Sequence, residues 1–101
     1  MSGIDGFDPV LHPPARLQIA AVLAQVDDAE FVRLREITGV SDSVLSKHLA
    51  ALAAAGHIKL RKAASDGRQR TWASLSRSGR AAFKAHVAAL QAIVAGKATS
   101  S

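Results

Sequence analysis

The stretch of residues 39–56 reads GVSDSVLSKHLAALAAAG, and it decides the fold. Gly39 suits the left-handed position that ends a helix, and Ser41 has a side chain that can accept N–H bonds at the start of the next helix. Val40, between them, supplies an apolar contact across the turn. Two helices joined by such a short, glycine-containing turn form a helix-turn-helix. The stretch therefore predicts this motif, with its second helix over residues 42–55.

The two sides of the predicted helix 42–55 differ in chemistry. At about 100° per residue, Leu45, Leu49 and Leu52 gather on one side, so we expect them to face the core. The opposite side carries small or polar residues and one lysine: Ser43, Ser46, Lys47 and Ala50. A side with such short side chains can enter the major groove of DNA, whose floor offers hydrogen-bond donors and acceptors. An ordinary solvated lysine is the other interpretation of Lys47, but its position opposite the leucines favours contact.

Two more helices are predicted before this stretch. Pro14 suits the first turn of a helix, because its missing N–H has no partner there, and apolar residues recur at helical spacing to about Gln25. Asp27 and Glu30 resemble a capping box, so we expect the next helix over residues 28–38.

A β-hairpin is predicted after residue 56. Ile58 and Leu60 alternate with polar or basic residues, as in a half-buried strand, and the alternation resumes before Leu75. Between the two strands, Ser65-Asp66-Gly67-Arg68 is typical of a tight hairpin turn. We call this hairpin, residues 57–75, the wing. It carries four basic residues that are placed to meet phosphates or to enter a minor groove: Arg61, Lys62, Arg68 and Arg70.

A last helix is predicted from the N-cap Ser76, with apolar residues at coiled-coil-like spacing. In so small a domain this seam has more apolar surface than one chain needs to cover, so we expect part of it to pack on a second copy of the chain. The predicted dimer interface combines the seam with residues of the first helix: Leu17, Ala20, Ala21, Ala24, Phe83, Val87, Leu90 and Val94. The wall of a ligand pocket is the other interpretation of the seam.

The basic charge is concentrated in one segment. The chain has 101 residues and a formal charge of +5, and residues 56–84 hold eight of the 13 Lys and Arg residues but one of the eight acidic residues. Such a segment attracts polyanions, as a nucleic-acid-binding surface does, although solvated basic surfaces also occur on other proteins. Exposure to solvent is expected for Arg77, Arg80 and Lys84. They begin the last predicted helix, whose apolar residues pack in the core or on a second copy of the chain.

Composition excludes several classes of function. The chain has no cysteine, which excludes disulfides, thiol nucleophiles and thiolate metal sites. No nucleophile, base and orienting residue occur at a recognisable spacing, so neither an enzyme activity nor a cofactor is expected. Without a basic N-terminal segment or a long apolar run, a cytoplasmic protein with no membrane partner is expected. We expect one domain over residues 13–96, a flexible arm over 1–12 and a flexible tail over 97–101.

The four histidines predict no metal site. His12, His57 and His86 are scattered along the sequence without a close partner. His48 lies at the margin of the apolar side of helix 42–55, where it is either a packed structural residue or one that titrates near neutral pH, binds a metal or touches a base. The position at that margin favours the structural role.

Three parts of the chain together resemble compact winged-helix regulators related to the MarR and ArsR families: Ser43 to Leu49 with Leu52, then Gly56-His57-Ile58, then Thr71-Trp72-Ala73-Ser74-Leu75-Ser76-Arg77-Ser78-Gly79-Arg80. The resemblance covers about residues 14–94. It implies a mainly α fold with a small β-hairpin (α+β), a winged helix-turn-helix of order α-α-α-β-β-α whose terminal helices build a two-fold dimer. It also implies DNA contacts from Ser43, Ser46, Lys47, Asp66, Gly67, Arg68 and Arg70. The cysteine-bearing metal motif of many ArsR proteins is missing, which removes that mode of sensing.

From these observations we expect a transcription regulator, acting as a repressor, that binds double-stranded DNA sequence-specifically as a homodimer. The residues expected to contact DNA are Ser41, Asp42, Ser43, Ser46, Lys47, Arg61, Lys62, Asp66, Gly67, Arg68 and Arg70. The alternative function is a winged-helix module that binds another protein and no DNA. The operator sequence, the regulated genes and any effector stay open, whether that effector is a small molecule, a protein or the concentration of the chain itself.

Overall fold

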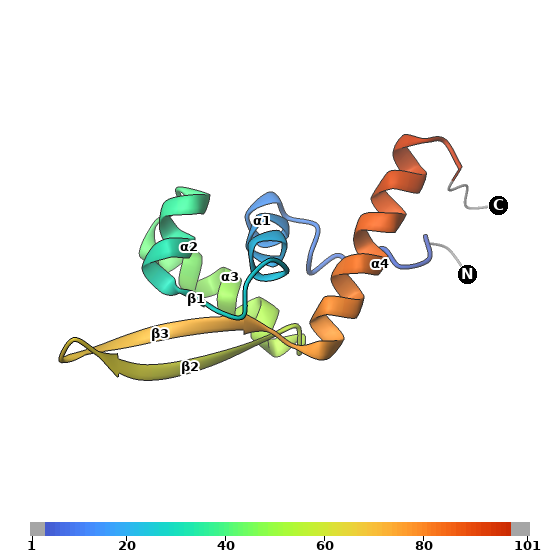
Figure 1. Cartoon of the computed structure of the whole chain (residues 1–101). Coiled ribbons are helices and arrows are strands. Elements are labelled where there is room, and N and C mark those ends of the chain that lie inside the picture. The colour runs from blue at the N-terminus through green and yellow to red at the C-terminus, as the bar shows by residue number, and fades with distance from the viewer. Residues whose placement is uncertain (1–3, 98–101) are drawn as a thin grey trace.

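Within residues 4–97, which the computed structural model describes, the chain forms four helices and a three-stranded antiparallel sheet (Figure 1). In chain order the elements are α1 (Pro14–Leu23), β1 (Ala29–Glu30), α2 (Phe31–Thr38), α3 (Asp42–Ala54), β2 (Ile58–Ser65), β3 (Arg68–Leu75) and α4 (Arg77–Val94). The predicted α+β winged helix-turn-helix is confirmed, with one short strand added ahead of α2.

The helix-turn-helix forms as its local signals predict. Gly39 ends α2 with a left-handed backbone at φ +72°. Ser41 begins α3, because its Oγ accepts a hydrogen bond from the N–H of Val44 at 3.2 Å. These two local caps set the short turn between α2 and α3, and Gln18 of α1 adds a hydrogen bond from Nε2 to the carbonyl of Ile37 at 3.1 Å.

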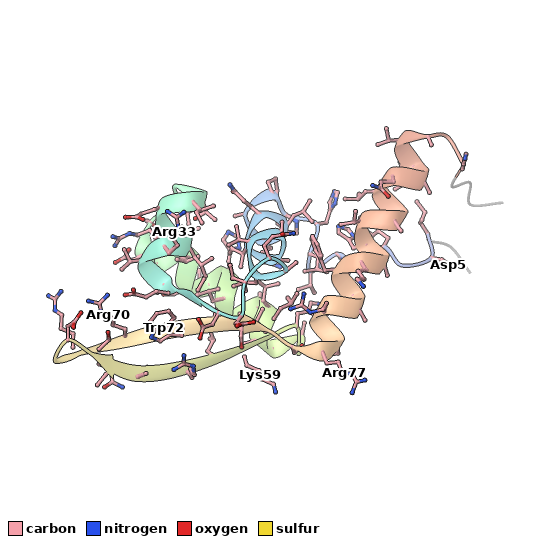
Figure 2. The ribbon with its side chains drawn as sticks, in the orientation of Figure 1. Asp5, Arg33, Lys59, Arg70, Trp72 and Arg77 are labelled. Atoms are coloured by element: carbon pink, nitrogen blue, oxygen red, sulfur yellow. The ribbon has the colours of Figure 1, made fainter. Side chains whose placement is uncertain are left out.

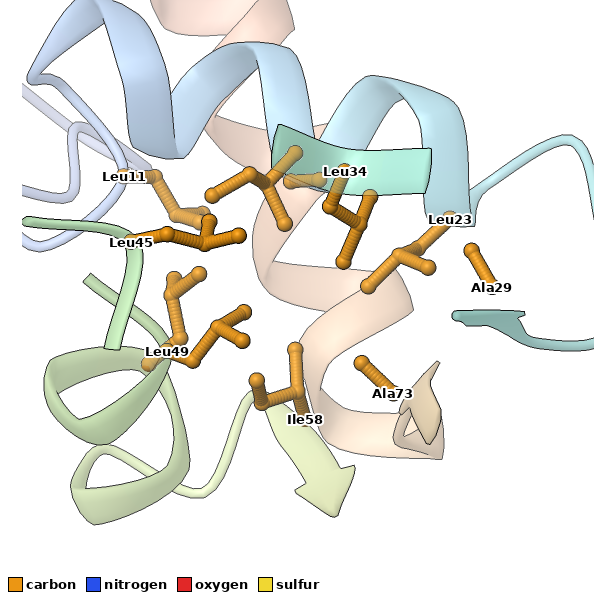
Figure 3. Packing of buried hydrophobic residues seen from close by; sticks show 11 residues of the cluster. Leu11, Leu23, Ala29, Leu34, Leu45, Leu49, Ile58 and Ala73 are labelled. Atoms are coloured by element: carbon orange, nitrogen blue, oxygen red, sulfur yellow. The ribbon is translucent and has the colours of Figure 1, made fainter. Parts of the chain in front are cut away.

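The core lies where α1, α2 and α3 meet the sheet (Figure 3). Leu45, Leu49 and Leu52 of α3 are buried in it, as predicted. They belong to one apolar cluster with residues of the other elements: Leu11, Ile19, Ala20, Leu23, Ala29, Leu34, Ile58 and Ala73. Because α3 turns its leucines inward, its other side is left to solvent.

The segment ahead of α2 differs from the prediction. Ala29 and Glu30 form β1, which pairs antiparallel with β3, and α2 begins only at Phe31. The side chain of Glu30 caps no helix and instead accepts hydrogen bonds from Arg70. The predicted capping box with Asp27 is therefore wrong, because pairing with a strand distant in sequence competes successfully with the local helix signal.

The segment before α1 packs on the domain, whereas the sequence predicts a flexible arm over residues 1–12. Leu11 is completely buried in the core. Gly6 has φ +84°, and a Cβ there would lie 2.7 Å from the carbonyl oxygen of Ala85 in α4. The prediction of a flexible arm is therefore wrong at Leu11, because burial of a large apolar side chain lowers the free energy of the folded chain. Residues 1–3, and residues 98–101 of the predicted tail, lie outside the described residues.

The wing is a regular two-stranded hairpin that extends beyond β1 (Figure 1). Ser65 pairs with Arg68, as predicted. Asp66 and Gly67 form the turn with φ of +54° and +74°. Two positive φ values are the mark of a type I′ turn, whose twist matches that of the flanking strands.

Helix α4 projects away from the core (Figure 1). It begins at the predicted N-cap Ser76, whose Oγ accepts a hydrogen bond from the N–H of Gly79 at 2.9 Å. A Cβ on Gly79 would overlap the carbonyl of His57, so glycine allows the close approach of α4 to the segment between α3 and β2. Four residues of α4 form the predicted apolar seam. Contacts within the chain half-bury Phe83, Val87 and Leu90, whereas Val94 is exposed.

Candidate nucleic-acid interface

The exposed side of α3 comprises Ser43, Ser46, Lys47 and Ala50, and the structure exposes all four residues. Three of the side chains are short, so a partner can approach the helix closely. Lys47 adds one positive charge. A helix of this kind fits the width of a major groove and offers hydroxyl and ammonium groups to base edges or phosphates.

The N-terminal end of α3 is tied to α2 and to its own cap. Arg35 donates a hydrogen bond from Nη1 to Oδ1 of Asp42 at 2.8 Å. This hydrogen bond, and after it the charge of the carboxylate, raises the pKa of Arg35 above its ordinary value. Ser41 serves as the cap and also lies 3.3 Å from the hydroxyl of Ser43. Asp42 and Ser41, both predicted DNA contacts, are exposed but already have partners within the chain.

Four of the predicted contacts on the wing are exposed: Asp66, Gly67 and Arg68 at its tip, and Lys62 in the middle of β2. Within residues 4–97, neither Lys62 nor Arg68 takes part in an ion pair. Their charges are therefore available to a polyanion.

The other two predicted wing contacts are engaged inside the chain. Arg61 lies with its guanidinium 5.5 Å from the ring centre of Trp72 and donates from Nη2 to Oδ2 of Asp28 at 2.7 Å. Arg70 donates from Nη1 to both carboxylate oxygens of Glu30, at 2.8 and 3.0 Å. Both arginines thus bind acidic residues just ahead of α2.

Sequence reasoning missed Asp28 and Glu30 as members of this site. Their partners lie 33 and 40 residues away along the chain, so no local pattern announces the pairs. The one available signal was the high density of basic residues in the wing beside an otherwise acidic N-terminal part.

His48 is held by α1. Nε of Arg16 donates a hydrogen bond to Nδ1 of His48 at 3.1 Å, and the side chain is half-buried. Burial, and after it the charge of Arg16, lowers the pKa of His48. These contacts favour the structural role over contact with a base.

The remaining histidines are gathered by the fold, although they are scattered in sequence. The backbone N–H of Asp8 donates to Nδ1 of His86 at 3.0 Å, while Oδ2 of the same residue lies 2.8 Å from Nε2 of His57. The rings of His12 and His86 are 5.7 Å apart. Burial, and after it the charge of His12, lowers the pKa of the completely buried His86, while Asp8 acts in the opposite direction. The expectation that these residues have no close partner is wrong.

The described residues include no group of three or more metal-ligating side chains. Two open hollows flank β1: one of about 470 Å³ along the edge of β3 near Arg68 and Arg70, and one of about 510 Å³ beside Trp72 and Val26. Over residues 4–97 the helices are all too short or too polar to cross a bilayer.

Known proteins resemble this chain in sequence and in fold. A family model described as a winged helix DNA-binding domain matches residues 15–94. An uncharacterized protein of Methanocaldococcus jannaschii is 30% identical over 78 residues, which cover 77% of this chain and 85% of that protein. A transcriptional regulator homologue from Pyrococcus horikoshii superposes with a TM-score of 0.80 at 26% identity, over 86% of each chain. The YusO protein from Bacillus subtilis shares the fold, with a TM-score of 0.73 at 24% identity over 82% of this chain and 58% of its own.

Proposed function

This chain belongs to the family of winged helix DNA-binding domains, and from that premise we propose that it is a sequence-specific transcription regulator that binds double-stranded DNA as a homodimer. The observation that carries the proposal is the exposed side of α3, where Ser43, Ser46 and Lys47 stand opposite the buried leucines. In the proposed complex this side lies in the major groove and the tip of the wing meets the backbone or the adjacent minor groove.

The proposed division of labour follows from charge. Lys62 and Arg68 on the wing neutralise phosphates and release counterions, which supplies affinity for any sequence. Ser43, Ser46 and Lys47 select bases, because hydrogen bonds to base edges carry sequence information. Asp42 and Ser41 support α3 through their partners within the chain.

A second copy of the chain is the proposed partner of α4. Val94 is 88% exposed and Ile93 40% exposed, and the half-buried seam continues this apolar surface along the helix. Ala20 is omitted from the proposed interface, because it is completely buried in the core of its own chain. A two-fold dimer would place the two copies of α3 one turn of DNA apart, about 34–36 Å, on a pseudo-palindromic site.

Repression is the proposed direction of control, because a dimer seated in two successive grooves blocks access to the DNA beneath it. In vitro transcription from a promoter that contains the selected site would fall on addition of the protein. A rise would show activation instead.

The test begins with selection of bound genomic fragments, followed by titration of a fluorescent duplex at several salt concentrations. We expect tight binding that weakens steeply with salt, with a slope of about −0.9 for each phosphate neutralised. Lys47→Ala should cost about 1–3 kcal/mol, which is about five- to 150-fold, and should relax the sequence preference. Lys97→Ala, an exposed lysine beyond α4, is the matched control and should change little.

Absence of binding at about 50 mM salt, or affinity that does not depend on salt, would contradict the proposal. Those results, together with cellular function that survives replacement of Lys47 and Arg68, would favour the protein-binding alternative.

A further inference from the structure

We propose that Asp28 and Glu30 are positioning residues for the wing, which they hold through Arg61 and Arg70, and that these two arginines do not contact phosphate. This inference rests on the proposed function, since the wing's role is to meet DNA. It assigns two acidic residues a favourable part in binding a polyanion.

The pair of Glu30 with Arg70 joins β1 to β3 near the end of their pairing. Trp72 is the last residue of β3 that pairs with β1, and its partner there is Glu30. The side chains of Arg70 and Glu30 are only 29% and 20% exposed. Nε of Arg70 is buried, so this edge of the guanidinium lies against the protein. Figure 2 shows Arg70 between Trp72 and the tip of the wing.

The pair of Asp28 with Arg61 crosses the sheet. Arg61 lies on β2 directly opposite Trp72 of the central strand β3. Its guanidinium passes by the Trp72 ring to reach Asp28, just ahead of the other edge strand β1. One side chain therefore links both edges of the three-stranded sheet.

The position of the pairs explains why the wing needs them. Among residues 4–97 no third strand pairs with the hairpin beyond Trp72, and an isolated two-stranded hairpin is only marginally stable in water. The two ion pairs stand at the last point where β1 supports the hairpin, so they fix the direction in which it projects. Arg68 at the tip and Lys62, next to Arg61 on β2, then meet phosphates at a set distance from α3.

The two interpretations of Arg70 predict opposite signs for a change at Glu30. If Arg70 contacts phosphate, Glu30 competes with DNA, and Glu30→Gln strengthens binding. If Arg70 positions the wing, Glu30→Gln weakens binding about two- to fivefold, the range expected for loss of a partly exposed ion pair.

The experiment measures affinity for a selected duplex against salt concentration for Glu30→Gln, Arg70→Gln and the double variant Glu30→Arg, Arg70→Glu. We expect each single variant to weaken binding with an unchanged salt slope, and the double variant to recover affinity. Asp27→Asn is the matched control, an exposed neighbouring acid outside the ion pairs described, and it should bind as well as the parent or better. Circular dichroism melting confirms that each variant is folded.

Stronger or unchanged binding by Glu30→Gln, or a salt slope that falls by about one in Arg70→Gln, would overturn the inference. If Glu30→Gln does not fold, Asp28→Asn replaces it, because Asp28 is more exposed and the same signs apply. Failure of the parent protein to bind duplex would instead refute the proposed function.

Discussion

Nε of Arg16 on α1 donates a hydrogen bond to Nδ1 of His48 on α3 at 3.1 Å. The same guanidinium donates from Nη1 to the carbonyl of Val10 at 3.3 Å. One arginine thus connects the segment before α1 with the helix proposed to read DNA. The bond to His48 requires a neutral imidazole, because a protonated ring has no acceptor nitrogen.

Stability should fall with acid in a definite range of pH. Burial lowers the pKa of both His48 and His86, so the unfolded chain binds protons more readily than the folded one. The free energy of unfolding should therefore be highest above about pH 6.5, the ordinary pKa of histidine, and should decrease as pH falls below it. Urea unfolding between pH 8 and pH 5 measures this.

The variant His86→Gln isolates the contribution of His86 to this pH dependence of stability. Its amide oxygen can accept the Asp8 N–H in place of Nδ1, but it does not titrate. We expect a shallower pH dependence in this range. A parent protein that gains stability between pH 7 and pH 5.5 would contradict the expected sign.

Leu11→Ala should destabilise the domain by about 2–5 kcal/mol, as truncation of a fully buried leucine does. The reason is the cavity it leaves in the core, since Leu11 has no exposed surface. Leu60→Ala, at a leucine that is 43% exposed, serves as control and should cost much less. A negligible effect of Leu11→Ala would mean that the segment before α1 is detached in solution.

Gly79→Ala should destabilise by about 1–3 kcal/mol, in the range of overpacked sites. The added methyl would overlap the backbone carbonyl of His57. The overlap can be relieved only if the start of α4 shifts away from His57. Ala81→Gly, at an exposed position on the same helix, should cost about 1 kcal/mol or less. Thermal melting compares the two. An increase in melting temperature for Gly79→Ala would show that α4 is free to shift.

Val94→Asp should weaken self-association by about 2 kcal/mol or more, because a charge cannot be buried unpaired in an apolar interface. Sedimentation velocity should show dimer converted to monomer, and binding to the full pseudo-palindrome should weaken more than binding to a half-site. Val32→Asp changes a valine that is 39% exposed and lies on α2, outside both helices of the proposed interface, so it should leave the dimer intact. If the Val94→Asp protein stays dimeric, the dimer interface does not include the end of α4.

Local interactions explain what could be predicted from the residues alone. The turn at Gly39, the caps at Ser41 and Ser76, and the hairpin turn at Asp66-Gly67 each depend on residues no more than about four positions apart. The buried side of α3 follows from helical periodicity, which needs only the spacing of leucines. For this reason the winged helix-turn-helix and the exposed side of α3 follow from the order of the residues alone.

Contacts between distant parts of the chain decided the rest. The short strand β1, the burial of Leu11 and the ion pairs of the wing arginines arise only when segments far apart in the sequence meet. The hydrogen bond from Asp8 to His86 joins residues 78 positions apart. Local sequence preferences do not predict such partners, because a strand pair or an ion pair stabilises the chain only after folding has brought its two distant segments together. The sequence by itself therefore determined which groups are basic, whereas the tertiary structure decided which of them are held in ion pairs within the chain.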